Sequence, residues 1–131
     1  MGSGGNTGAQ AATLMVRALA TENFTGAQWM NTLLKEIGVG SLLSITMGLG
    51  IAVLGIVRDD WSLGITVGLA MGAIGLLSNV IGILFPIALN YFRVDPAVAS
   101  SPMVTSTADV SSLGLYFAIA TFLLKNAPGG M

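Results

Sequence analysis

The chain has 131 residues, of which 53% are hydrophobic and 8% charged, and its formal net charge is −1. Soluble domains carry about 25% charged residues. Together with a mean hydropathy of +0.83, this excludes a soluble globular domain. The charge balance also excludes the basic surface that nucleic-acid binding requires. There is no cysteine or histidine, which removes disulfides, thiolate chemistry, the usual zinc sites and histidine bases. Oxygen ligands remain, and they suit hard cations.

The amino-terminal segment is rich in glycine. Residues 4–10 read G-G-N-T-G-A-Q, and we expect a helix to follow from about Gly8 to Ala20. The apolar part of that helix is too short to cross a bilayer, which takes about 20 residues. The segment 4–20 is therefore predicted to be a polar stretch followed by a half-helix.

Three uncharged runs are long enough to span a membrane. The second, which starts at Trp61, stays uncharged through Phe92 and exceeds a hydrocarbon core of ~30 Å, so we expect it to tilt or to end near Pro86. The third begins at Pro102, whose ring suits the first turn of a helix. The sequence predicts an all-α membrane protein, a single transmembrane domain over residues 1–131. Its spans are 37–57, 61–86 and 102–124.

Small residues recur at helical spacing on the first two spans. Membrane helices use such residues to bring their backbones together, so these faces predict tight helix packing. Asn79, on the second face, is predicted to make a hydrogen bond between helices, with pore lining as the alternative. The first face holds Gly40, Ser44, Gly48, Ala52 and Gly55, and the second Gly64, Gly68, Gly72, Gly75, Asn79 and Gly82.

Asp109 is the one charged residue inside a span. A carboxylate there costs roughly 2.5–3.5 kcal/mol on insertion scales and marks a candidate functional site. No lysine or arginine lies in any span to pair with it. Two explanations remain: a protonated carboxyl bonded to a neighbour, or a bound cation or water-filled path. On a helix, its side also carries Thr105, Ser106, Ser112 and Tyr116.

Two stretches carry motifs that recur together in known proteins. They are residues 4–20, G-G-N-T-G-A-Q-A-A-T-L-M-V-R-A-L-A, and residues 95–110, D-P-A-V-A-S-S-P-M-V-T-S-T-A-D-V. The first is similar to the pore-helix motif of the MgtE family of magnesium transporters, the second resembles that family's last transmembrane helix, and both occur in the family's order and spacing. The resemblance covers nearly the whole chain. It implies a multi-pass protein of the cell inner membrane that transports Mg²⁺ as a homodimeric channel.

The resemblance also implies roles for individual residues. The family's pore carboxylate, which holds hydrated Mg²⁺ largely through water, corresponds to Asp109, and its loop acid corresponds to Asp95. The half-helix of residues 4–20 would line the pore together with the last helix. The pore-lining residues are then expected to be Gly4, Gly5, Asn6, Gly8, Thr105, Ser106 and Ser112, with Gln10 in the same motif.

The chain departs from the family pattern at two positions. Ser101 stands before the proline, where Gly or Asn is frequent, and Ser112 stands where Gly is common. Residues corresponding to the family's first helix, most of its second and its cytosolic sensor domain are not in the sequence. Whether the chain is a cut piece or a natural short form stays open, and those parts are possible partners.

Other functions compete with a magnesium channel. One is a structural membrane subunit, or truncated fragment, without transport of its own. The other is a carrier that couples a divalent cation to Na⁺ or H⁺, for which a lone protonatable Asp109 would serve. An enzyme is not expected, because the chain lacks His and Cys and has one acid in its spans, where catalysis would need paired groups.

The spans predict an orientation. They place Arg17, Lys35 and Arg93 on one side of the membrane and Arg58 and Lys125 on the other. Cytoplasmic loops carry more basic residues, so three against two favours the side with Arg17, Lys35 and Arg93 as the cytoplasmic one. A cysteine introduced by Gly130→Cys should therefore react with an impermeant thiol reagent from outside. Labelling from the cytoplasm alone would reverse the topology.

Overall fold

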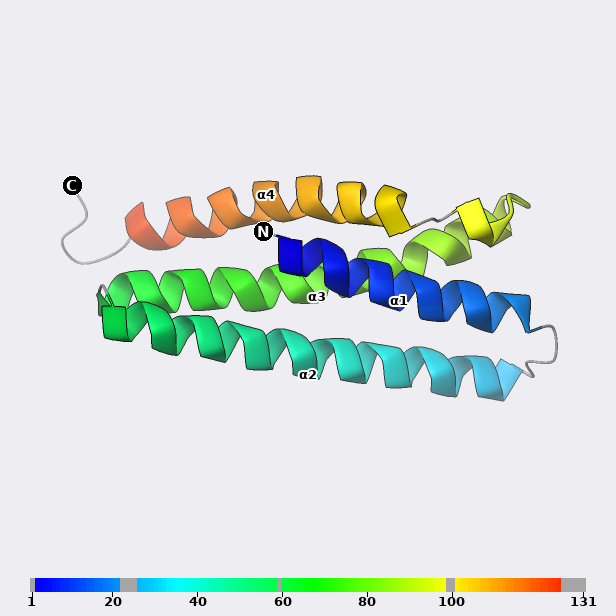
Figure 1. Ribbon diagram of the computed structural model, residues 1–131, viewed down its shortest axis with the longest axis horizontal. Coiled ribbons are helices and arrows are strands. Elements are labelled where there is room, and N and C mark those ends of the chain that lie inside the picture. Colours follow the sequence, from blue (N-terminus) through cyan, green and yellow to red (C-terminus); the bar gives the residue numbers. More distant parts are fainter. Residues whose placement is uncertain (1, 22–25, 59, 99–100, 126–131) are drawn as a thin grey trace.

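The computed structural model describes residues 2–21, 26–58, 60–98 and 101–125. Each regular element in these ranges is a helix (Figure 1). Three are long and apolar enough to cross a membrane, Met30–Arg58, Trp61–Tyr91 and Ser101–Leu123. The predicted fold class, an all-α protein with three spans, is therefore confirmed. The elements are α1 (Gly2–Ala20), α2 (Gly26–Arg58), α3 (Trp61–Tyr91), the 3-10 turn η1 (Pro96–Val98) and α4 (Ser101–Lys125).

Two helix boundaries differ from the expectation. α1 begins at Gly2 and not near Gly8, so the Gly-rich segment is helical. Glycine in a helix costs about 1 kcal/mol, but here packing against other helices compensates. α3 continues through Pro86 to Tyr91 instead of ending at the proline. Pro86 is buried, and neighbouring helices allow a proline inside a membrane helix.

Helix α3 is the centre of the bundle. It packs against α1, α2 and α4, whereas α2 and α4 do not contact each other. Figure 1 shows α2 and α4 on opposite sides of α3, with α1 beginning near the middle of α3 and α4. The first residues of α1 therefore lie at mid-depth of the spans, away from both ends of the bundle.

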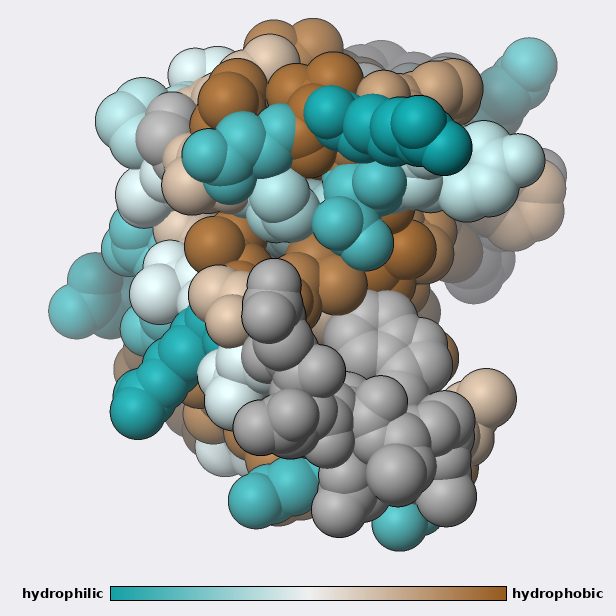
Figure 2. Space-filling model, turned by 90° about the vertical axis from the view of Figure 1, so that its right-hand side faces the viewer, coloured by the Kyte–Doolittle hydropathy of each residue, from teal (hydrophilic) through white to brown (hydrophobic). Residues whose placement is uncertain are grey.

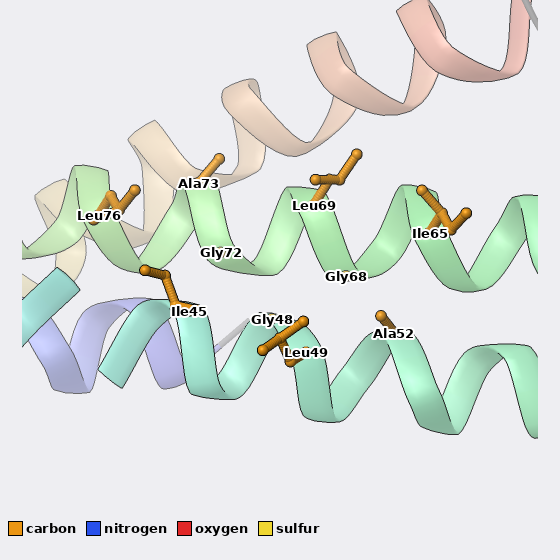
Figure 3. A pocket seen from close by; sticks show the side chains of 10 residues that line it. All are labelled: Ile45, Gly48, Leu49, Ala52, Ile65, Gly68, Leu69, Gly72, Ala73 and Leu76. Atoms are coloured by element: carbon orange, nitrogen blue, oxygen red, sulfur yellow. The ribbon is translucent and has the colours of Figure 1, made fainter. Parts of the chain in front are cut away.

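The small-residue faces of α2 and α3 meet, as predicted. A β-carbon on Gly68 would lie 2.5 Å from Ala52 Cβ, and one on Gly48 would lie 2.9 Å from the carbonyl oxygen of Gly68. Asn79 Nδ2 donates to the carbonyl oxygen of Glu36 at 3.4 Å, which confirms its bond between helices. An apolar groove of about 440 Å³ runs along this same contact, lined by Gly48, Ala52 and Gly68 and by larger residues such as Ile45 and Leu76 (Figure 3).

The end of α3 turns the chain toward Asp95. Arg93 adopts a left-handed φ of 58°. Its N–H donates to Asn90 O at 3.1 Å, and the N–H of Val94 donates to Leu89 O at 2.9 Å. These two bonds form a Schellman motif, which satisfies the last carbonyls of the helix. This end of the bundle faces the viewer in Figure 2, where hydrophilic side chains gather around apolar ones, as at a membrane boundary.

The α2–α3 interface predicts a difference between two glycines. Gly68→Ala should lower the stability of the protein by about 1–3 kcal/mol, because the new methyl meets packed atoms that cannot move away. Gly50→Ala is the matched control on α2, since a β-carbon there meets nothing within 4 Å. Thermal unfolding in detergent compares the two variants. Equal midpoints would show that the face of Gly68 is not a packing surface.

Candidate ion site between helices α1 and α4

Asp109 lies in the middle part of a span. It is about 12 Å along α4 from Ser101, at 1.5 Å per residue. The residue is half-buried, and its Oδ1 is buried without a hydrogen-bond partner among the described residues. A buried polar atom without a partner is destabilising and requires an explanation. Asp109 is therefore the strongest candidate for a functional group in the described part of the chain.

Helix α1 brings Gly5 against this carboxylate. A β-carbon on Gly5 would lie 2.8 Å from Asp109 Oδ1 and 2.6 Å from Thr105 Cγ2. The Thr105 hydroxyl donates to the carbonyl oxygen of Gly5 at 3.5 Å, a long hydrogen bond. Ala12 and Val104, both fully buried, pack in the same α1–α4 contact. Two predicted site residues, Gly5 and Thr105, thus lie beside Asp109.

Three other predicted pore-lining residues lie buried between helices. A β-carbon on Gly4 would lie 2.9 Å from Ser78 Oγ, and one on Gly8 would lie 2.8 Å from the carbonyl oxygen of Ser78. The hydroxyl of Ser112 is within 3.3 Å of the Ser78 hydroxyl, and both residues are fully buried. These positions hold α1, α3 and α4 together. The sequence reasoning missed Ser78, although its neighbour Asn79 belongs to the predicted small-residue face.

An open hollow, lined in part by polar side chains and called the polar hollow below, follows the exposed side of α1. It has a volume of about 560 Å³ and runs to the first residue of α4. Asn6, Gln10 and Thr13 recur along one side of α1, at i, i+4 and i+7. Ser106 is also exposed, and its hydroxyl donates to the carbonyl oxygen of Pro102 at 2.9 Å. The hollow is lined by Asn6, Ala9, Gln10, Thr13, Leu14 and Ser101.

Asp95 is exposed and lies outside the Asp109 site. Its Oδ1 accepts a hydrogen bond from the N–H of Ala97 at 2.8 Å, which orders the turn into η1. Within the described ranges, no three His, Cys, Asp or Glu side chains are grouped closely enough to hold a metal ion. The site can therefore offer carboxylate and hydroxyl oxygens to the water shell of a cation, but it is not a cage of direct ligands.

Known proteins match nearly the whole of this chain. Relatives named magnesium transporter MgtE are 39% identical in Thermus thermophilus, 32% in Enterococcus faecalis and 30% in Bacillus subtilis. Each match covers 95% of this chain but 28% of the relative, so the chain spans under a third of their length. The family model MgtE, described as a divalent cation transporter, matches residues 1–119. The chain is thus a multi-pass membrane protein that belongs to the MgtE family of divalent cation transporters.

Proposed function

We propose that this chain forms the ion-selecting part of a magnesium transporter in a bacterial inner membrane. The observation that carries the proposal is Asp109, the one charged residue in the middle of a span, which is only partly buried, so that its carboxyl group can still face an ion. A carboxylate at this depth is favourable only if a cation or water faces it. Three relatives named as magnesium transporters support Mg²⁺ as the ion.

The ion keeps its water shell in this proposal. Mg²⁺ dehydrates reluctantly and is bound through one or two carboxylates and several waters. A single Asp109 per chain fits that requirement, because the waters donate hydrogen bonds to the carboxylate and to nearby oxygens. Thr105 and Ser106 lie on the same helix as Asp109 and are the proposed contacts of the shell from α4, with Asn6 from α1.

The polar hollow is the proposed route to Asp109. Asp95 is exposed and precedes the start of α4 by six positions in the chain; its charge is proposed to raise the local concentration of cations. Ser101 and the amides of Asn6 and Gln10 line the hollow, and their polar atoms replace part of the bulk water. The ion then passes from a wet mouth to a carboxylate in a drier region, where the same charge attracts it more strongly.

A second copy of the chain is the proposed cover of this route. Polar side chains at membrane depth are stable where they line a water-filled cavity or are buried in protein, and not against lipid. Asn6, Gln10 and Ser106 are exposed, so one chain alone leaves them facing hydrocarbon. A homodimer that joins two such faces encloses the hollow and brings two Asp109 carboxylates to one axis.

Asp109→Asn tests the site. The substitution keeps the size of the side chain and removes the charge that attracts a hydrated dication. The affinity for Mg²⁺ should fall by more than about tenfold, or 1.4 kcal/mol. Asp95→Asn should have a smaller effect, because solvent screens an exposed charge. Isothermal titration of each variant with Mg²⁺ in lipid nanodiscs measures these changes.

Asp60→Asn is the matched control. It removes the same charge from an exposed position before α3, far from Asp109 along the bundle, and should leave the affinity unchanged. Equal Mg²⁺ binding by the wild-type chain and Asp109→Asn would refute the ion site and favour a structural membrane subunit. Mg²⁺ flux into liposomes without proton or sodium gradients separates a channel from a coupled carrier, which would need one of those gradients.

A further inference from the structure

The two oxygens of the Asp109 carboxylate have different surroundings. Oδ1 is buried and has no hydrogen-bond partner among the described residues. The residue as a whole is partly exposed, and with Oδ1 buried we assign the exposed side of the carboxyl group to Oδ2. Only Oδ2 is therefore free to face an ion or its water shell.

The backbone of Gly5 covers Oδ1. A β-carbon on Gly5 would lie 2.8 Å from Oδ1 and 3.2 Å from Asp109 Cγ, so any larger residue would displace the carboxyl group. Glycine places a Cα hydrogen there instead, and such a hydrogen makes a weak contact with oxygen. The methyl group of Thr105 fills the adjoining space, 2.6 Å from the same β-carbon position. The burial of Asp109 Oδ1 beneath α1 thus depends on glycine at position 5, because a side chain there would occupy the space next to the oxygen.

We propose that Gly5 is a specificity-determining residue that restricts Asp109 to one oxygen and thereby makes the site prefer hydrated Mg²⁺ over Ca²⁺. The inference rests on the proposed function, because it assumes that Asp109 faces the ion. It assigns to Gly5 a role in ion choice, beyond allowing α1 to pack against α4.

Coordination chemistry connects the covered oxygen to ion choice. Ca²⁺ takes six to eight oxygen ligands in flexible geometry and often binds both oxygens of one carboxylate. Mg²⁺ keeps several waters, and each of these can donate a hydrogen bond to a single carboxylate oxygen. A carboxylate whose Oδ1 is covered can accept hydrogen bonds from the waters of Mg²⁺ through Oδ2. It cannot bind Ca²⁺ through both oxygens. Within one chain, the described ranges hold no group of three or more His, Cys, Asp or Glu side chains that could complete a direct coordination shell for Ca²⁺.

Gly5→Ala is the direct test. The methyl group should push the carboxyl group away from α1 and expose both oxygens. The ratio of Ca²⁺ affinity to Mg²⁺ affinity should then rise by about tenfold, equivalent to 1.4 kcal/mol. Titration calorimetry with each ion on the 131-residue chain in nanodiscs measures the ratio. Parallel changes in the two affinities would assign Gly5 to packing alone.

A second variant keeps the test valid if Gly5→Ala alone does not fold. Thr105→Ser removes the methyl group that crowds position 5 and keeps the hydroxyl that donates to Gly5 O. In the double variant Gly5→Ala/Thr105→Ser, the new methyl group at position 5 no longer meets the methyl group of residue 105, but it still meets Asp109 Oδ1. The ratio of Ca²⁺ affinity to Mg²⁺ affinity should therefore still rise relative to Thr105→Ser alone. Gly75→Ala is the steric control: its β-carbon would lie 2.5 Å from Ser44 Oγ on α2, and the ratio should not change.

Infrared spectra give a readout that a packing role would not alter. The separation between the antisymmetric and symmetric carboxylate bands narrows when both oxygens bind one ion. Difference spectra against Asp109→Asn isolate this carboxylate. In the wild-type chain we expect the pattern of an uncoordinated carboxylate with Mg²⁺, which keeps its water shell, and the one-oxygen pattern with Ca²⁺. In Gly5→Ala we expect the two-oxygen pattern with Ca²⁺. A two-oxygen pattern with Ca²⁺ in the wild-type chain would overturn the inference.

The outcomes separate this inference from the proposed function. If Asp109→Asn binds Mg²⁺ as well as the wild-type chain does, or if the wild-type chain binds neither ion, both proposals fail. If binding depends on Asp109 but the ratio and the bands stay unchanged in Gly5→Ala and in the double variant, only the role of Gly5 fails. A raised ratio with the two-oxygen pattern supports both.

Discussion

Close contact between helix backbones is the constraint on which this bundle depends. Lipid tails are as apolar as the side chains that face them, so hydrophobic burial does not hold membrane helices together, and close van der Waals contact must. Gly4, Gly5 and Gly8 provide that contact where α1 meets α3 and α4. The same contact positions the candidate ion site, because α1 forms one wall beside Asp109. Packing and proposed ion choice therefore depend on the same few residues.

Several hydroxyl groups in the described spans donate to a carbonyl oxygen of their own helix. Ser44 donates to Gly40 O at 2.7 Å and Ser106 to Pro102 O at 2.9 Å, each four residues back. Such bonds satisfy a hydroxyl in hydrocarbon without a partner helix. A stripe of serines and threonines is therefore weak evidence for a pore. An ionised Asp109 has no donor to offer to the carbonyl oxygen four residues back. Within the described spans, the evidence for a functional site therefore rests mainly on this one side chain.

The sequence predicted what depends on composition and periodicity. The three spans, the packed glycine faces and the bond of Asn79 follow from apolar length and helical spacing. It did not predict that α1 begins at Gly2, and it left open whether α3 would tilt or end near Pro86, because local propensity opposes a helix at both places and only neighbouring helices overrule it. Helical spacing placed Ser112 on the side of Asp109, but it could not show that Ser78 meets its hydroxyl. The roles of the site residues remain predictions.

The glycine contacts also constrain how this sequence can diverge. At Gly8 and Gly48 the atom nearest to an added β-carbon would be a backbone carbonyl oxygen, of Ser78 and Gly68 respectively. No substitution shortens a backbone, so these glycines have no compensating partner. At Gly75 the obstacle is the side chain of Ser44, and Gly75→Ala becomes acceptable together with Ser44→Gly. During divergence of this fold, glycines that face a backbone oxygen should therefore stay unchanged. Glycines that face a side chain should change together with the residue that carries that side chain.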